Sequence, residues 1–183
     1  MKKIVKGCLF LILMVFFLGC NNNLTAKDAV VEYLNGYINN DESIVNELND
    51  YVNNEDFTDE QKELYRKILL KQYNTLTYNV VNETYDGDKA TVVVRIKVID
   101  LYTPQVEAVK YLNESSEKFY DSDNKYDKNL FLNYKLEKMN ESTEMVEYNI
   151  NFKVMKNDKK KWEVVQLSND DLEKIHGIYG FTE

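Results

Sequence analysis

Two segments of the chain alternate apolar and polar residues with a period of two, and this pattern limits the fold more than any other feature of the sequence. Every second residue is apolar from Ala90 to Val98, and again from Val146 to Val154. Successive side chains of a β-strand point to opposite faces of the sheet. Each segment is therefore predicted to be a strand with one packed and one solvent-exposed face.

Turn residues beside both segments place each of these strands in a hairpin. An Asp-Gly pair at residues 86–87 joins the first strand to residues 76–80, which also alternate, and this pair favours a type I′ turn. The lysine-rich turn Asn157–Lys161 follows the second strand and leads into a further apolar segment, residues 162–167. Two hairpins predict four mainly antiparallel strands.

Helix-capping residues and helical periodicity predict helices around these hairpins. The predicted helices begin near Thr25, Asp41, Thr58, Thr103, Tyr126 and Ser168. Thr25 and Thr58 stand at the start of capping boxes, Pro104 suits the first turn of a helix, and Gly177 is predicted to end the last helix. The order ααα-ββ-αα-ββ-α predicts an α+β fold, in which helices pack on one face of a curved, mainly antiparallel four-stranded sheet.

The first nineteen residues have the parts of a secretory signal peptide. A basic start with Lys2, Lys3 and Lys6 precedes an uncharged apolar run of ten residues, Leu9 to Leu18. A helix of that length spans about 15 Å, against about 30 Å for the hydrocarbon core of a bilayer. The run is therefore too short for a comfortable transmembrane helix, and residues 1–19 are predicted to be a cleaved signal peptide.

The end of this segment, Phe17-Leu18-Gly19-Cys20, resembles the lipobox of bacterial lipoproteins. In that motif a small residue precedes a cysteine that is diacylated before cleavage, and Gly19 and Cys20 match it, whereas Phe17 and Leu18 depart from the usual residues. The resemblance implies that Cys20 carries the lipid, that residues 20–24 form the lipidated tether, and that two acyl chains hold the protein on the extracytoplasmic face of the cell membrane. The alternative is an ordinary signal peptide, or an uncleaved anchor, with an incidental cysteine.

The composition of the mature chain limits its partners. Removing the three signal lysines from the 23 basic side chains leaves 20 against 31 acidic ones, a net charge of −11. Such a chain is not expected to bind nucleic acid, and an anionic membrane surface repels it. Cys8 is lost with the signal, so the mature chain has neither a disulfide nor a cysteine metal site. Residues 25–183 are predicted to form one domain without a cofactor or metal.

The predicted domain resembles small lipoproteins of Gram-positive bacteria whose domain is like nuclear transport factor 2 or cystatin. The resemblance covers about residues 25–180 and rests on four features. These are the opening helix (Ala26 to Ile38), the strand ending in Val98-Ile99-Asp100, the terminal hairpin with Lys159 to Val165, and the short closing helix. It implies a cone-shaped domain whose open end can hold a ligand, in a family that also includes non-catalytic partners.

Asp100 is the candidate pocket residue, because it lies in phase with the inward face of residues 90–98. A carboxylate in a poorly solvated cone could act as a base. The favoured alternative is that the strand ends there and Asp100 caps the turn into the next helix. The only histidine, His176, is predicted near the end of the last helix, where a protonated imidazole suits the helix dipole. No catalytic residue is predicted.

Two polar segments have weaker interpretations. Asp121–Asp127 is superficially like a calcium loop but lacks its glycine and its glutamate, so it is predicted to be a solvated interhelical loop. The lysines Lys159–Lys161 are predicted to be a solvated hairpin tip, with a role facing anionic envelope polymer or lipid headgroups as the alternative. Most tyrosines fall on predicted apolar faces and are expected in the core.

The function expected from the sequence is that of a lipid-anchored extracytoplasmic lipoprotein. Its domain is expected to be a non-catalytic binding or accessory domain of the cell envelope, with an envelope protein or a small apolar ligand as partner. The alternative is a small enzyme of isomerase, cyclase or hydrolase type that uses Asp100 in a cone-shaped pocket.

Overall fold

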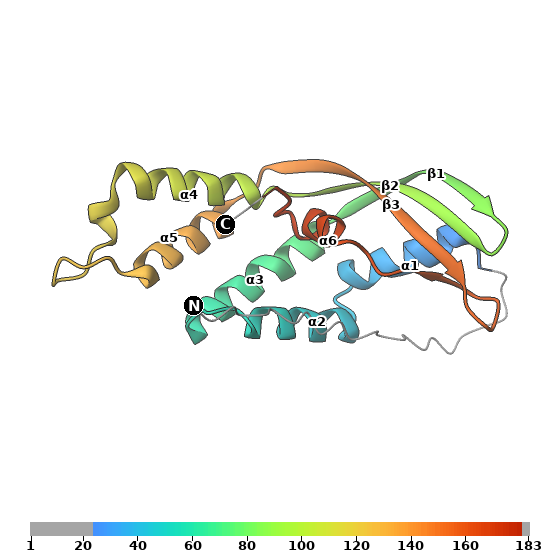
Figure 1. The fold of residues 1–183 in the computed structure, drawn as a ribbon, viewed down its shortest axis with the longest axis horizontal. Coiled ribbons are helices and arrows are strands. Elements are labelled where there is room, and N and C mark those ends of the chain that lie inside the picture. Colours follow the sequence, from blue (N-terminus) through green and yellow to red (C-terminus); the bar gives the residue numbers. More distant parts are fainter. Residues whose placement is uncertain (1–23, 181–183) are drawn as a thin grey trace, which may run out of the picture.

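The computed structural model describes residues 24–180, and its elements follow the predicted order (Figure 1). The helices are α1 (Ala26–Ile38), α2 (Glu42–Asn53), α3 (Asp59–Thr75), α4 (Tyr102–Glu114), the short 3₁₀ helix η1 (Ser116–Phe119), α5 (Lys128–Glu141) and α6 (Asn169–His176). The strands are β1 (Thr77–Asp86), β2 (Lys89–Ile99), β3 (Met145–Lys156) and β4 (Trp162–Val164). The predicted signal peptide, Cys20 and the tether as far as residue 23 lie outside the described residues.

The four strands form one antiparallel sheet in the order β1-β2-β3-β4, as two paired hairpins require. In the central pair, Val92 lies opposite Phe152 and Val94 lies opposite Ile150. All four side chains are fully buried on the inner face, while the residues between them point outward. The period-two alternation therefore marks strands with one buried and one outward face, as predicted, and the predicted α+β class is confirmed.

A β-bulge in β1 was not predicted from the sequence. The register of β1 against β2 shifts between Val80 and Asn82, and the Val81 side chain between them is half exposed. A bulge of this kind bends the strand and increases its local twist. Beyond it, Tyr85 returns to the inner face opposite Ala90.

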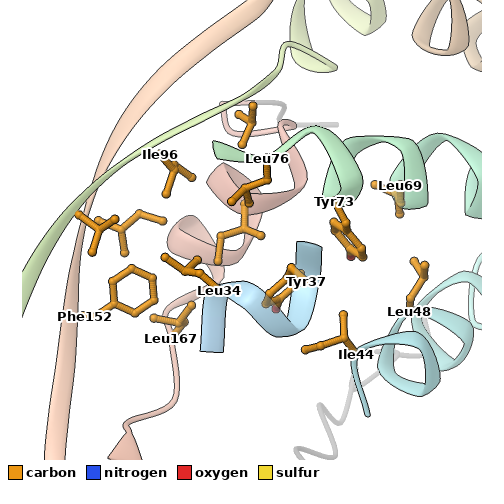
Figure 2. Packing of buried hydrophobic residues seen from close by; sticks show 14 of the residues in the cluster. Leu34, Tyr37, Ile44, Leu48, Leu69, Tyr73, Leu76, Ile96, Phe152 and Leu167 are labelled. Atoms are coloured by element: carbon orange, nitrogen blue, oxygen red, sulfur yellow. The ribbon is translucent and has the colours of Figure 1, made fainter. Parts of the chain in front are cut away.

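The main hydrophobic core lies between the inner face of the sheet and three helices, α1, α3 and α6 (Figure 1). Figure 2 shows Leu34 of α1, Leu76 after α3, Ile96 of β2 and Phe152 of β3 converging in this space. Burying a side chain of this size contributes roughly 1.5–3 kcal/mol. α2 packs outside α3 and extends the same cluster through residues such as Leu48.

Capping boxes begin α1 and α3, as the sequence predicts. At α3 the backbone N–H of Gln61 donates to Thr58 Oγ1 over 3.3 Å, and the Thr58 N–H donates to Gln61 Oε1 over 3.0 Å. Asp41 occupies the N-cap position of α2, but its carboxylate makes no capping hydrogen bond. The side-chain cap predicted at Asp41 is therefore absent.

The last helix ends at Gly177, as predicted, in a left-handed conformation with φ of 74°. A Cβ atom at this position would overlap the carbonyl oxygen of Ile99, so only glycine satisfies both the backbone angle and the close approach. The Gly177 carbonyl accepts a hydrogen bond of 2.8 Å from the N–H of Leu101. The end of α6 is thereby attached to the junction of β2 and α4.

Gln72 of α3 reinforces this junction from the core side. Its side chain is fully buried. Nε2 donates to the carbonyl of Ile175 over 3.0 Å, and Oε1 accepts from the N–H of Ile99 over 2.7 Å. One amide side chain therefore joins α3, the end of β2 and the end of α6.

The helices α4 and α5 form a helical hairpin that extends beyond the end of the sheet (Figure 1). It has a small hydrophobic cluster of its own, separate from the main core, around Ala108, Phe119 and Phe131. α5 also packs against α3, which connects this hairpin to the body of the domain. The predicted packing of helices on one face thus applies to α1, α3 and α6, whereas α4 packs mainly against α5 and η1.

Candidate functional site

Asp100 lies between the end of β2 and the start of α4, where its carboxylate caps the helix. Oδ1 accepts hydrogen bonds from the backbone N–H groups of Tyr102 and Thr103, both at 2.9 Å. Oδ2 accepts a hydrogen bond of 2.6 Å from the Thr103 hydroxyl. Both oxygens are therefore engaged within the first turn of α4, in the arrangement expected of a capping residue.

Two open depressions on the described surface lie away from Asp100. One runs along α3 and is lined by residues such as Arg66 and Leu70. The other lies near the tips of the β-hairpins, lined by Tyr85, Lys89 and Met155 among others. Both are open to solvent, and Asp100 lines neither. The inner face of the sheet, on which the period-two phase would place Asp100, is filled by apolar side chains of the main core.

His176, the last residue of α6, is held between two tyrosine rings. Its ring centre lies 5.9 Å from that of Tyr51 and 5.7 Å from that of Tyr73. These rings exclude water from most of the imidazole, and the desolvation lowers the pKa of His176 to about 4. At neutral pH the imidazole is therefore uncharged. It does not supply the positive charge that its position at a helix end would favour.

The tyrosines around His176 continue into the core, as their positions on apolar faces predict. The hydroxyls of Tyr33 and Tyr37 are 3.3 Å apart, and the rings of Tyr37 and Tyr73 meet edge to face at 5.0 Å. Burial raises the pKa of Tyr33 to about 12 and raises those of Tyr37 and Tyr73 as well. These phenols stay protonated at neutral pH and act as packing and hydrogen-bonding groups.

The Asp121–Asp127 segment is a closed turn at the far end of the α4–α5 hairpin. Asp121 Oδ1 accepts hydrogen bonds from the backbone N–H groups of Asp123 and Lys125, both at 2.9 Å. A β-bridge between Tyr120 and Tyr126 closes the turn. The carboxylate thus stabilises its own loop, and residues 24–180 contain no group of three or more histidine or acidic side chains placed to hold a metal ion.

Basic residues gather at the opposite end of the molecule, at the tips of the two β-hairpins (Figure 1). Asp88, in the first turn, accepts ion-pair contacts from Lys160 at 2.9 Å and from Lys156 at 3.1 Å. Hydrogen bonds from Lys160 and Lys156 hold the pKa of Asp88 below its usual value. The Lys156 ammonium also lies 4.9 Å from the ring centre of Trp162. This cation–π contact joins the two strands on either side of the second turn.

Comparison of the chain with models of known protein families, with curated protein sequences and with solved structures gave no match. Within residues 24–180, none of the helices combines the length and the apolar character needed to cross a bilayer.

Proposed function

We propose that the protein is a lipoprotein anchored through Cys20 to the extracytoplasmic face of the cell membrane. The proposal is supported by the order of features along the chain: a basic start, an apolar run of ten residues, a Gly-Cys pair and an asparagine tether. The folded domain then begins at once, since the capping box of α1 starts at Thr25, five residues after Cys20. The chain has the arrangement of an export signal, an attachment point, a short tether and a compact domain.

We further propose that the domain is a non-catalytic binding or accessory domain of the cell envelope, with an envelope protein or a small apolar ligand as its partner. The observation that carries this proposal is the engagement of Asp100 by three hydrogen bonds at the start of α4. The alternative, an isomerase-, cyclase- or hydrolase-type enzyme, needs this carboxylate free in a cavity. His176, the other candidate acid or base, is enclosed by tyrosine rings and uncharged at neutral pH.

The anchor is tested by metabolic labelling with a fatty acid in a bacterial host that processes lipoproteins. The wild-type chain is expected to incorporate the label and to partition into detergent, and Cys20→Ala is expected to lose both properties. Cys8→Ala is the matched control, because it removes the other cysteine of the precursor from within the predicted signal. Label that persists in Cys20→Ala, or that disappears equally in Cys8→Ala, would contradict the proposal.

A further inference from the structure

The two hairpin turns and the start of α1 lie at the same end of the molecule. We call the turns, residues 86–89 and 156–161, the tip surface. Figure 1 shows both turns at one end of the long axis, beside the first turn of α1, with the α4–α5 loop at the opposite end. α1 also packs against β1 and β4, the strands that border these two turns.

The charge of the tip surface has the opposite sign to that of the whole chain. The tip surface contains five lysines against three aspartates, whereas the mature chain carries a net charge of −11. One of these aspartates, Asp88, is already paired with two of the lysines. Lys89 and Lys161 are exposed and make no ion pair with another described residue. The tip surface is therefore a local cationic patch on an acidic protein.

Apolar side chains border this patch. Tyr85 is 50% exposed, Met155 is 45% exposed and Val165 is 37% exposed. Together with Lys89 and Lys153 they line the open depression at this end of the sheet. Aromatic and apolar side chains beside lysines suit the interface between lipid headgroups and acyl chains, where an apolar body and a polar end are both accommodated.

We propose that the tip surface faces the membrane and binds anionic lipid headgroups beside the lipid anchor. This inference rests on the proposed anchor at Cys20. Four residues lie between Cys20 and Thr25, and even a fully extended chain over these five residue steps spans at most about 18 Å. The first turn of α1 is thus held close to the headgroups, and the tip surface beside it is held there with it.

Because the tether is short, weak attractions between the tip lysines and the lipid headgroups are sufficient to orient the domain. Charges on a free protein are screened within about 8 Å at physiological ionic strength. An acidic protein in solution would therefore not be drawn to an anionic bilayer by a few lysines. Once the anchor holds the tip surface at the bilayer, the lysines act at a high effective concentration of headgroups. The domain then stands on its hairpin tips, and the α4–α5 hairpin points away from the membrane.

The orientation is tested with the acylated full-length mature protein reconstituted into vesicles, with a single fluorophore on an introduced cysteine. Thr84→Cys places the fluorophore near the end of β1, two residues before the tip surface, and Ser122→Cys places it between η1 and α5 as the matched control. Energy transfer to labelled headgroups is expected to be several-fold higher from position 84 than from position 122. Equal transfer from both positions in anchored protein overturns the inference.

The headgroup specificity is tested by the vesicle composition. Adding phosphatidylglycerol to phosphatidylcholine is expected to raise transfer from position 84, and high salt is expected to reverse this gain. Replacing Lys159, Lys160 and Lys161 by glutamine should abolish the gain, whereas the same change at Lys110, Lys118 and Lys125 of the α4–α5 hairpin should leave it intact. If energy transfer from position 84 does not depend on phosphatidylglycerol while the tip lysines bind soluble polyphosphate, the inference is overturned in favour of an anionic polymer.

The two proposals fail in distinguishable ways. A protein that carries no acyl chain and does not stay with the vesicles refutes the anchor. A protein that is acylated and vesicle-bound, but shows neither the positional difference nor the lipid dependence, refutes the membrane-facing tip surface alone.

Discussion

At the scale of single residues, the fold depends on side chains that satisfy backbone groups far away in the sequence. Gln72 bonds to Ile99 and Ile175, which lie 27 and 103 residues away along the chain. A buried donor or acceptor left without a partner costs about 1–3 kcal/mol. The end of β2 and the end of α6 are therefore stabilised by a side chain that belongs to neither element.

The stability of the domain is expected to fall as the pH drops from about 6.5 to about 4. In this range the unfolded imidazole of His176 takes up a proton, while the folded one, with a pKa of about 4, remains neutral. The unfolded state then binds more protons, so acid favours it by at most about 1.4 kcal/mol per pH unit. Urea unfolding at pH 7 and pH 5 measures the loss.

His176→Phe keeps an aromatic ring between Tyr51 and Tyr73 but removes the proton, and it serves as the control for this pH dependence. The wild-type protein is expected to lose about 2 kcal/mol more than His176→Phe between the two pH values, as an upper limit. Carboxylates titrate equally in both proteins. Equal losses would show that His176 is as accessible to protons in the folded chain as in the unfolded one.

Gly177→Ala is expected to destabilise the domain more than Gly87→Ala. Both glycines have left-handed backbone angles, with φ of 74° and 59°, so each alanine is strained by about 1–2 kcal/mol. Only at Gly177 does the added methyl group also overlap the Ile99 carbonyl, because Gly87 has open space around it. Denaturant unfolding measures the loss of unfolding free energy in each variant, and the difference between them gives the cost of this overlap. Equal losses would contradict the close approach of α6 to β2.

At the scale of elements, the start of α4 depends on Asp100. Asp100→Ala removes three hydrogen bonds and is expected to lower the free energy of unfolding by about 1–2 kcal/mol. Asp100→Asn keeps an acceptor oxygen and should cost less. Asp123→Ala, which removes an exposed carboxylate from the α4–α5 loop, is the control. Thermal unfolding of the three variants provides the measurement, and an unchanged midpoint for Asp100→Ala would argue against capping.

The elements that sequence reasoning predicted are those whose signals are local. Strand alternation in residues 90–98 and the capping boxes at Thr25 and Thr58 involve residues within a few positions of each other, and the structure confirms them. The period-two pattern also extends through Asp100, but the chain turns there. Phase alone therefore could not decide whether this carboxylate points inward or caps α4, although the cap was the favoured interpretation.

The features that sequence reasoning missed depend on partners brought together by the fold. The bulge at Val81 and the Gln72 contacts have no local signal, because each is defined by a neighbouring element. Asp41 is the right residue type at the N-cap position of α2, but its side chain makes no capping hydrogen bond, and residue type alone does not reveal this. The position of His176 between Tyr51 of α2 and Tyr73 of α3 likewise has no signal in the sequence of α6.

At the scale of the whole molecule, the domain consists of a large body and a smaller α4–α5 hairpin. The hairpin has a small hydrophobic cluster of its own, while Leu136 and Met139 of α5 belong to the main core. The small cluster around Phe119 buries little apolar surface, so this hairpin is expected to open locally at a lower free energy than the body. Contact between α5 and α3 couples the two parts.

Phe119→Ala is expected to accelerate amide hydrogen exchange in α4, η1 and α5 while leaving α1 and β2 protected. Removing a buried phenylalanine costs about 3–5 kcal/mol of stability. Because Phe119 belongs to the small cluster, this loss is expected to destabilise the α4–α5 hairpin first. Tyr120→Ala, at an exposed neighbour, is the control. Mass spectrometry of exchanged peptides locates the effect. Faster exchange throughout the sheet would mean that the hairpin and the body unfold as one cooperative unit.

The bulge at Val81 also affects whether neighbouring copies of the domain can pair through the edges of their sheets. β1 and β4 are the two free edges of the sheet, and a long flat edge invites strands of neighbouring molecules to add to it. β4 is only three residues long, and the bulge interrupts the ten residues of β1. Neither edge therefore offers an uninterrupted template. Under the proposed lipid anchor, copies of the domain would share one membrane plane and meet edge to edge, and the bulge would then limit strand addition between them.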